Sequence, residues 1–390
     1  MAGHRPSLDL VVVANPGSRR LALLGQAMAG RGVPAPRVVS YEEYLRGGVR
    51  LARVLREGSV LRIESPGQDF EVERAILALG TEDERPGGSS LGREGLGRLA
   101  FDRGRILGPG QWYAGFSRLL RRIREDRTDA PPHAVMNDEE SIAMLFDKPR
   151  CREHLVDGGI PCPRALGPVG GYDELRDRML DARVGRVFVK LRCGSSASGI
   201  VAFESSGPRT QAFTTVEVVE AADGPRLYNS RRIRRLSDER EIARLIDMLA
   251  ADGVHVEQWV PKAGLEGLAF DVRVVVIAGR AGHAVVRLGR GPMTNLHLKS
   301  RRGSVPTLRG RMGEPAWESL LETCRRVGEA FPGCQYLGVD VAVLPGYRRH
   351  VIFEANAFGD LLPGVLDPSG RDTYTAEIEA LAVRPARSRP

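Results

Sequence analysis

Three oxygen-bearing side chains toward the end of the chain could hold a metal ion. Asp340 lies in one apolar run, and Glu354 and Asn356 lie in the next, after a Pro-Gly-Tyr turn. Because side chains alternate between the faces of a strand, an antiparallel hairpin over 336–356 places Glu354 and Asn356 on one face, where Asp340 can join them. Clustered carboxylates require a cation between them, and hard oxygen ligands suit Mg2+ shared with nucleotide phosphates. The alternative is that Asp340 caps a turn and Glu354 lies on a solvated face.

Lysine is rare in this sequence, so any lysine in a motif is informative, and Lys190 occurs in a pattern suited to phosphate binding. Only four are present, at positions 148, 190, 262 and 299. Lys190 ends an apolar strand over 186–190, and a loop of small residues leads from it to a return strand over 200–203. Such a loop lets backbone amides and hydroxyls approach phosphate oxygens, and the ammonium adds a point charge. The loop residues concerned are Gly194, Ser195, Ser196, Ser198 and Gly199. The same patterns are also typical of a flexible turn and, for Lys148, of a surface lysine on a helix.

The elements that must position these groups can be predicted from apolar periodicity. Residues 1–135 are expected to form an α/β unit, because strands over 9–14, 37–40 and 60–63 are each followed by a helical stretch. The segment 64–67 follows the third strand at its carboxyl end, where open α/β sheets bind ligands, and is a candidate for substrate contact. A helix beginning at Asn137 or Asp138 is expected to break at Pro149 and to end at Gly158. Further strands are predicted over 254–261, 270–277 and 282–290, with a helix over 314–330.

Composition argues against several classes of protein. The 390-residue length indicates two or three domains, and 42% hydrophobic residues fit a globular enzyme. No apolar run approaches the roughly 18 residues that span a bilayer, and no signal peptide is evident, so a cytoplasmic protein without membrane partners is expected. The net charge of +8 comes from arginines spread along the chain, so no nucleic-acid partner is expected. Five cysteines without a C-x-x-C pair and seven histidines without H-E-x-x-H favour neither zinc nor disulfides.

The order of these motifs resembles that of the ATP-grasp superfamily, in particular its glutathione-synthetase and RimK-like ligases. The resemblance covers about residues 137–366 and rests on the Asp-Lys pair at 147–148, the Lys190 hairpin, the Asp-Val-Arg strand opening at 271–273 and the Asp…Glu-x-Asn hairpin. It implies an α/β (α+β) protein with an ATP-grasp fold behind an N-terminal Rossmann-like (pre-ATP-grasp) domain. The predicted boundaries are 1–135 for that domain, 136–260 for the first ATP-grasp lobe, 261–382 for the C-terminal lobe, and 383–390 for a disordered tail.

The resemblance also implies roles for individual residues. Two Mg2+ ions, which Mn2+ can replace, would bridge the phosphates of ATP from Asp340, Glu354 and Asn356, while the 194–199 loop closes over the γ phosphate. The other implied roles are phosphate binding by Lys148, Lys190 and Arg273, adenine binding by the 254–261 strand with Glu257 and Val260, ribose or metal binding by Asp271, neutralisation of the transferred phosphoryl group by Arg287, and its orientation by Asn295. Alternatively, Asp271 and Arg273 could simply pair with each other on the outer face of the sheet.

The implied activity is ATP-dependent ligation of a carboxylate to an amine or another nucleophile through an acyl phosphate, with ADP and phosphate as products. The acid can be a small molecule or a peptide, and a homo-oligomer is compatible with this activity. Met293 stands where relatives carry an arginine, and Leu-Lys-Ser follows His297 in place of Arg-Gly-Gly, so the acceptor region departs from the family pattern. Two alternatives stay open: an ATP-grasp kinase acting on a small molecule, and a nucleotide-binding accessory protein without turnover.

Overall fold

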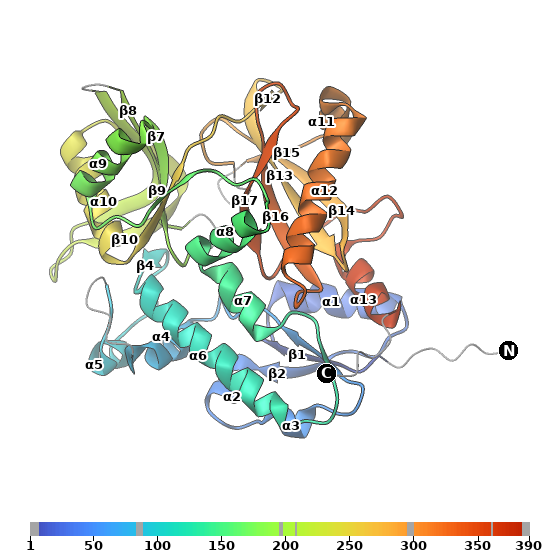
Figure 1. The fold of residues 1–390 in the computed structure, drawn as a ribbon. Helices are drawn as coiled ribbons and strands as arrows, with labels where there is room; N and C mark the ends of the chain where they lie inside the picture. Colours follow the sequence, from blue (N-terminus) through green and yellow to red (C-terminus); the bar gives the residue numbers. More distant parts are fainter. Residues whose placement is uncertain are drawn as a thin grey trace.

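The computed structural model describes residues 8–82, 89–194, 198–206, 209–294, 300–359 and 362–383. Three sheets organise the chain (Figure 1): a parallel sheet near the N-terminus and two antiparallel sheets. The antiparallel sheets lie above the parallel one, and two helices from the middle of the chain, α7 and α8, lie where the three parts meet. This mixture of sheets and covering helices confirms the predicted α/β (α+β) class.

The N-terminal part is a four-stranded parallel sheet in the order β2-β1-β3-β5. Alternate residues of β1 pack on opposite sides, with Val11 and Val13 toward α4 and α6, and Leu10 and Val12 toward α1 and α13. The C-terminal helix therefore covers one face of the first strand of the chain. The elements are β1 (Leu10–Ala14), α1 (Arg19–Gly30), β2 (Arg37–Ser40), α2 (Tyr41–Leu45), α3 (Leu51–Val54), β3 (Val60–Ile63), α4 (Phe70–Leu79), η1 (Gly80–Glu82), α5 (Arg93–Gly97), α6 (Pro109–Thr128), β5 (Ala134–Val135) and α13 (Thr373–Val383).

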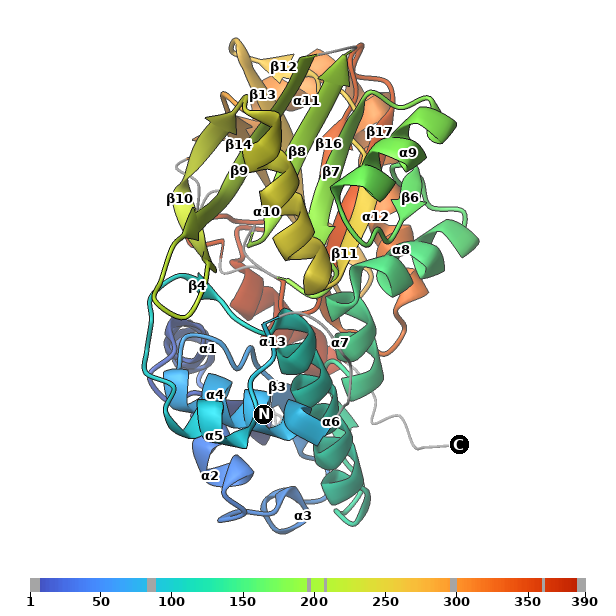
Figure 2. The same ribbon diagram turned by 90° about the vertical axis from the view of Figure 1, so that its left-hand side faces the viewer.

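The second sheet has seven strands in the order β4-β10-β9-β8-β7-β11-β6. Its helices α9 and α10 cover the outer face, as Figure 2 shows, and bury Leu245 and Leu249 against Val189 and Val256. Strand β4 lies within residues 1–135 but pairs with β10. The second sheet therefore includes a strand from before the domain boundary predicted at residue 135. The elements are β4 (Arg105–Ile106), β6 (Ala165–Gly167), α9 (Tyr172–Ala182), β7 (Arg186–Leu191), β8 (Ile200–Ser206), β9 (Arg209–Val219), β10 (Arg226–Leu236), α10 (Glu239–Ala251) and β11 (Val254–Gln258).

The third sheet runs β15-β14-β13-β16-β17, with β12 beside β13. One face packs on α12 through alternate apolar residues such as Val272, Val274 and Val339, which leaves the residues between them on the other face. The elements are β12 (Gly264–Leu265), β13 (Leu268–Ile277), β14 (Arg280–Gly289), β15 (Arg301–Gly303), α11 (Val305–Met312), α12 (Glu314–Ala330), β16 (Tyr336–Val343) and β17 (His350–Asn356).

Two consecutive helices, α7 (Glu139–Phe146) and α8 (Lys148–Asp157), connect the parts. The predicted break at Pro149 is wrong: the helices separate at Asp147, whose carboxylate accepts a hydrogen bond from the backbone N–H of Arg150. Proline fits the first turn of a helix, because the N–H that it lacks has no partner there, so Pro149 belongs to the start of α8.

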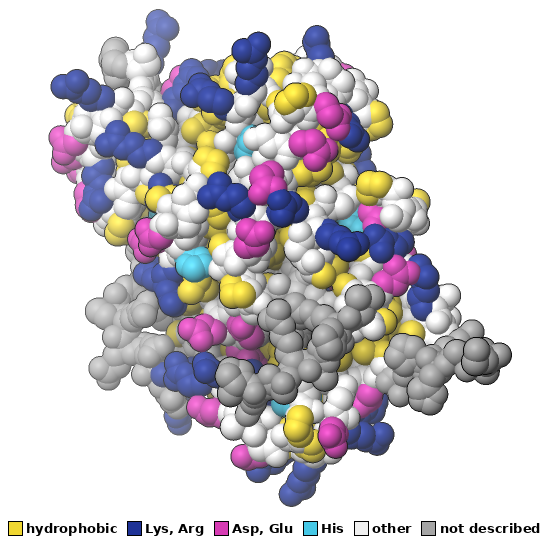
Figure 3. Space-filling model, turned by 45° about the vertical axis from the view of Figure 1, so that its right-hand side comes forward, with side chains coloured by type: hydrophobic (Ala, Val, Ile, Leu, Met, Phe, Trp, Pro, Cys, Tyr) yellow, Lys and Arg dark blue, Asp and Glu magenta, His cyan; other side chains and the backbone are white. Residues whose placement is uncertain are grey.

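Charged side chains of both signs are mixed on the face drawn in Figure 3. Lys and Arg alternate there with Asp and Glu and do not gather into one continuous stripe. In the part of the chain that the structure describes, no helix combines the length and the apolar character needed to cross a membrane.

Candidate active site

The β16–β17 hairpin places the three candidate metal ligands on one face of the third sheet. Asp340 is opposite Glu354, and Gly338 is opposite Asn356. The side chains of Asp340, Glu354 and Asn356 therefore project from the same face of the hairpin. A bulge follows the Asp340–Glu354 pair and adds Phe353 to β17. Bulges redirect side chains, and here Phe353 and Glu354 both line a cavity between the two antiparallel sheets. The hairpin expected over 336–356 is therefore present, with one irregularity that simple alternation does not predict.

Asp340 is held by two arginines from neighbouring strands. Arg273 on β13 donates two hydrogen bonds to it, from Nε to Oδ1 at 2.5 Å and from Nη2 to Oδ2 at 2.8 Å. Arg287 on β14 contacts Asp340 Oδ1 at 2.8 Å and donates from Nε to Asp271 Oδ1 at 2.6 Å. Burial raises the pKa of Asp340, but the two guanidinium groups outweigh it and hold the pKa well below its ordinary value. Asp271 and Arg273 thus pair with other residues, not with each other, and they do so in a buried position.

Lys262 extends this cluster from the link between the two antiparallel sheets. Its ammonium donates to Thr294 Oγ1 at 2.6 Å and lies 3.5 Å from Asp271 Oδ2. Burial lowers the pKa of Lys262, although Asp271 opposes the shift. With Arg273 and Arg287, Lys262 supplies three cations against the two carboxylates of Asp271 and Asp340. Among the described residues, this concentration of cations suits an anionic ligand.

The cavity between the sheets collects the other predicted cations. Lys148, at the start of α8, pairs with Glu354 and donates to the Gly194 carbonyl at 2.8 Å. Lys190, on β7, pairs with Glu257 on the adjacent β11. Burial lowers the pKa of Lys148, but Glu354 outweighs this effect and raises it above the ordinary value. Lysines from one side of the cavity and carboxylates from both sides thus neutralise each other across a narrow space.

Phe353 and His255 also line or border this cavity. The Phe353 ring has the Lys262 ammonium 5.3 Å from its centre and the Lys190 ammonium 5.9 Å away, distances at which a ring face attracts cations. His255 is buried beside Lys190, and its Nε2 atom has no hydrogen-bond partner among the described residues. Burial, and then the charge of Lys190, lowers the pKa of His255 to about 3. The imidazole is therefore neutral at physiological pH.

The Lys190 hairpin forms as predicted, since β7 and β8 pair from Arg186–Glu204 to Lys190–Ile200. Gly199 has a φ of +65°, and a Cβ there would lie 2.2 Å from the Leu191 side chain, so this loop position requires glycine. Gly194 and Ser198 are at the base of the loop. Ser195 and Ser196 lie outside the described residues, as does Asn295, so the structure places none of these three.

The predicted adenine strand is not exposed. β11 is bonded to β7 along its length and to β6 at Val256 and Glu257, because it lies inside the seven-stranded sheet. Within β11, the backbone therefore has neighbours on both sides from Val256 to Gln258 and is not exposed there as expected. Val260 lies beyond the end of β11, half-buried in the link that leads to Lys262. Backbone groups that could pair with a base must therefore lie in this link.

A divalent cation would find few protein ligands here. The described residues contain no group of three or more His, Cys, Asp or Glu side chains arranged to hold a metal ion. Asp340, Glu354 and Asn356 offer two carboxylates and one amide, and the Nδ2 atom of Asn356 is buried without a hydrogen-bond partner. This set fits Mg2+, which commonly takes one or two carboxylates and completes its shell with phosphates and water. Asp340 would have to exchange its arginines for the metal.

Solved structures resemble this chain over nearly its whole length. The ATP-grasp ligase PsnB, complexed with precursor peptide PsnA2 and AMPPNP, has 18% sequence identity and a TM-score of 0.51, covering 97% of this chain and 98% of that chain. D-cycloserine synthetase DcsG has 12% identity and a TM-score of 0.55, covering 96% and 98%. The chain has the ATP-grasp fold. N5-carboxyaminoimidazole synthase from Aspergillus clavatus, with ADP and 5-aminoimidazole ribonucleotide, has 12% identity and a TM-score of 0.55, covering 98% of this chain and 79% of that chain. Neither a protein-family model nor a curated protein sequence matches the chain.

Within this ATP-grasp fold, three residues of the site were not singled out from the sequence. Lys262 could have been found, because every lysine is informative in a chain with so few. Thr294 is an ordinary residue beside a loop, and Phe353 enters the cavity only because of a bulge. For these two the sequence offers no local signal, since their roles depend on contacts with distant strands.

Proposed function

We propose that this protein is an ATP-dependent ligase that joins a carboxylate to an amine through an acyl phosphate, with release of ADP and phosphate. The observation that carries the proposal is the meeting of opposite charges in the inter-sheet cavity. Lys148 pairs with Glu354 and Lys190 with Glu257, while Asp340 pairs with two arginines. A magnesium nucleotide brings both signs of charge, so its phosphates can take over Lys148 and Lys190 while its cation takes over Glu354 and Asp340.

The proposed mechanism assigns each side chain a simple task. Lys148 and Lys190 bind the α and β phosphates, and Asp340, Glu354 and Asn356 would hold Mg2+, which neutralises phosphate charge when it is bound. Arg273 and Arg287, which bind Asp340 in this structure, would lie beside the transferred phosphoryl group and offset its charge. The substrate carboxylate attacks the γ phosphorus, and the P–O bond to ADP breaks. The amine then attacks the acyl carbon, and phosphate leaves. No side chain forms a covalent intermediate.

The identity of the products separates ligation from phosphorylation of an alcohol. Purified protein with Mg-ATP should release ADP only when a carboxylate and an amine are both supplied, or when hydroxylamine replaces the amine and traps the acyl phosphate as a hydroxamate. Mass spectrometry of a reaction with mixed metabolites or peptides identifies the new amide. A stable phosphoester formed with one acceptor would establish the kinase alternative in its place, and the absence of any turnover would favour an accessory protein.

Glu354→Gln should abolish most of this turnover, because an amide cannot balance the charge of a divalent cation. We expect ADP release to fall by about 100-fold or more, as losing a metal contact worth several kcal/mol implies. Glu318→Gln, an exposed change on α12, is the matched control and should behave as the wild type. Equal ADP release by Glu354→Gln and the wild type would refute the assignment of the metal site.

A further inference from the structure

A single residue, Asp147, separates α7 from α8 and lies against the base of the glycine loop. Its backbone N–H donates to the Met144 carbonyl and closes α7, while its carboxylate accepts from the Arg150 N–H and caps α8. Only 2% of the Asp147 side chain is exposed. A carboxylate buried to this extent is costly to keep charged unless a cation is bound to it.

Arg192 supplies that cation from the other side of the contact. It directly follows β7, and its backbone N–H donates to the Gly253 carbonyl at 3.0 Å. Its side chain donates from Nη2 to Asp147 Oδ2 at 2.7 Å, and from Nε to both carboxylate oxygens at 3.2 Å. Two nitrogens of the guanidinium thus bind one carboxylate, which fixes the direction of the pair as well as its distance.

Lys148 makes two further connections between the loop and α8. Its backbone N–H donates to the Arg192 carbonyl at 3.1 Å, and its ammonium donates to the Gly194 carbonyl at 2.8 Å. The first N–H groups of a helix have no partner inside the helix. In α8 the first one binds the loop, the second residue is proline, and the third N–H binds the Asp147 carboxylate. These four residues therefore form a joint between the loop and α8.

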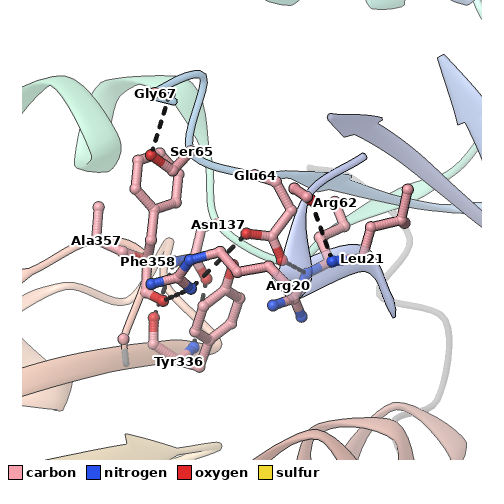
Figure 4. Close-up of polar contacts among 12 residues, drawn as sticks. Arg20, Leu21, Arg62, Glu64, Ser65, Gly67, Asn137, Tyr336, Ala357 and Phe358 are labelled. Carbon is pink, nitrogen blue, oxygen red and sulfur yellow. Dashed lines mark hydrogen bonds and ion pairs between the residues drawn. The ribbon is translucent and has the colours of Figure 1, made fainter. Parts of the chain in front are cut away.

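The helix pair is also fixed to the hairpin that carries the candidate metal ligands. Asn137, just before α7, donates to the carbonyls of Tyr336 and Ala357, beside the start and the end of that hairpin (Figure 4). The Lys148 ammonium pairs with Glu354 on the second strand of the hairpin. Helices α7 and α8 therefore connect the candidate phosphate loop to the candidate metal ligands.

The ion pair in the joint does not compete with ligand binding, whereas the Lys148 ammonium does. When this ammonium turns to a phosphate, its bonds to Gly194 and Glu354 are the ones at risk. The loop and α8 then depend on the Asp147–Arg192 pair and on one backbone hydrogen bond. The pair is thus suited to hold the loop in place at the moment when the ligand draws Lys148 away.

Direct binding of phosphate by Arg192 is the alternative, because 43% of its side chain is exposed. Its Nε and Nη2 atoms are both used by Asp147. Turning them to a ligand would leave the carboxylate of Asp147 buried and without its cation, which is costly. The geometry therefore favours a role that acts through Asp147.

We propose that Arg192 is a positioning residue. Through its ion pair with Asp147 it holds the glycine loop against the start of α8, so that the loop and Lys148 present their donors to adjacent phosphates of one nucleotide. This inference deepens the proposed function, on which it rests for the identity of the ligand as a magnesium nucleotide. Arg192 itself does not touch the nucleotide.

A double-mutant cycle on binding tests the pair. Mg-AMPPNP is titrated calorimetrically into the full-length wild type, Arg192→Met, Asp147→Ser and the double variant. Serine still caps a helix but is too short and uncharged to bind the guanidinium. Each single substitution should weaken binding by about five- to tenfold. The double variant should bind no more weakly than the singles, because either substitution alone already removes the pair.

Arg178→Met is the matched control. Arg178 lies on α9, which covers the outer face of the same sheet, and it is 38% exposed. It also binds a carboxylate through two nitrogens, from Nε and Nη2 to Glu174 Oε1 at 3.0 and 2.7 Å. Its removal should change the affinity for Mg-AMPPNP by less than about twofold. Circular dichroism and thermal unfolding verify that every variant is folded at the temperature of the titration.

Four results would overturn the inference. Arg192→Met binds as tightly as the wild type, or no more weakly than Arg178→Met. Arg192→Met is weakened while Asp147→Ser is not, which would mean that the guanidinium contacts the nucleotide itself. The losses of the two single variants add in the double variant, which would mean that the two residues act separately.

Hydrogen exchange separates this inference from the proposed function. If the wild type does not bind Mg-AMPPNP, the ligase proposal fails, and the joint is then judged without a ligand. Arg192→Met should speed exchange at the Lys148 N–H, which binds the Arg192 carbonyl, and at the Leu191 N–H, which binds the Gly199 carbonyl. We expect at least about a threefold change for both, and none for Arg178→Met. Unchanged exchange at both positions would show that Arg192 does not hold the loop to α8.

Discussion

At the scale of single residues, the site is a set of charges that satisfy each other until a ligand replaces some of them. Asp340 has two arginines, while Lys148 and Lys190 each have one glutamate. Lys262 differs, because its close partner is the neutral hydroxyl of Thr294, with Asp271 farther away. Its charge is therefore less closely paired than those of Lys148 and Lys190, and its burial should be visible in the pH dependence of stability.

Lys262→Met should remove a pH-dependent part of the folding free energy. Burial lowers the pKa of Lys262 below its ordinary 10.5, so the unfolded chain keeps this proton to higher pH than the folded protein. Between the lowered pKa and 10.5, the wild type therefore gains stability as pH rises, and the variant lacks this gain. The difference in free energy of unfolding, wild type minus variant, should increase in denaturant titrations as the pH rises toward 10.5. A difference independent of pH would contradict the burial of a charged Lys262.

At the scale of elements, two hairpins and the residue that precedes helix α7 position the site. The β7–β8 hairpin carries Lys190 and the glycine loop, and the β16–β17 hairpin carries the candidate metal ligands. Asn137, just before α7, ties the second hairpin to the N-terminal part. It is fully buried, donates to the Tyr336 and Ala357 carbonyls at 2.8 and 2.7 Å, and accepts from the backbone N–H of Gln335 at 3.1 Å.

Gly199→Ala should destabilise the loop of the first hairpin. Its φ of +65° disfavours a side chain, and the new Cβ would lie 2.2 Å from Leu191 Cδ1, so we expect a loss of about 1–2 kcal/mol. Gly194→Ala is the control, because a Cβ there would meet Ser198 O at an ordinary 3.4 Å and its φ is not positive. In chemical denaturation Gly199→Ala should be less stable than Gly194→Ala, and it should also bind Mg-AMPPNP more weakly. Indistinguishable variants would mean that the loop tolerates side chains.

Asn137→Ala should loosen the second hairpin. It leaves two carbonyls and the Gln335 N–H without their side-chain partner in a buried place, which should lower the free energy of unfolding by about 3 kcal/mol. Affinity for Mn2+ in the presence of AMPPNP should fall as well if the hairpin binds metal. Asp138→Ala is the control: it removes only the cap on the Ser141 N–H, for an expected loss of about 1 kcal/mol. A loss for Asn137→Ala no larger than that of the control would contradict the role of Asn137.

At the scale of the whole molecule, the C-terminal helix packs against the N-terminal parallel sheet and its helix α1. Helix α13 packs beside α1 (Figure 1), and Glu377 of α13 binds Arg62 of β3. Arg62 also lies over the Tyr336 ring, with its guanidinium carbon 4.4 Å from the ring centre. One buried arginine therefore joins the parallel sheet, the C-terminal helix and the start of β16.

Arg62→Met should destabilise the protein strongly, because Glu64 and Glu377 would lose their common partner. A loss of about 3–5 kcal/mol is expected for breaking a buried ion pair. Adding Glu377→Gln to this variant should restore part of the loss, since one uncompensated charge disappears. A double-mutant cycle of unfolding free energies measures this coupling. Additive effects of the two substitutions would show that Arg62 and Glu377 do not depend on each other.

The sequence by itself determined the local elements and which residues could do chemistry. The alternation of apolar residues and the turn residues predicted the hairpin at 336–356 and the Lys190 hairpin. The rarity of lysine drew attention to each lysine in the sequence. These features depend on near neighbours in the chain, so a single sequence contains them. The parallel strands at 9–14, 37–40 and 60–63 were predictable for the same reason.

Only the tertiary structure decided which charges meet. Arg273 pairs with Asp340, 67 positions away, and not with nearby Asp271, because strand register across a sheet is set by long-range packing. The bulge at Phe353, the enclosure of β11 between two strands and the burial of Asn15 and Glu64 arise in the same way. Each depends on segments far apart in sequence, whose contacts local periodicity does not encode.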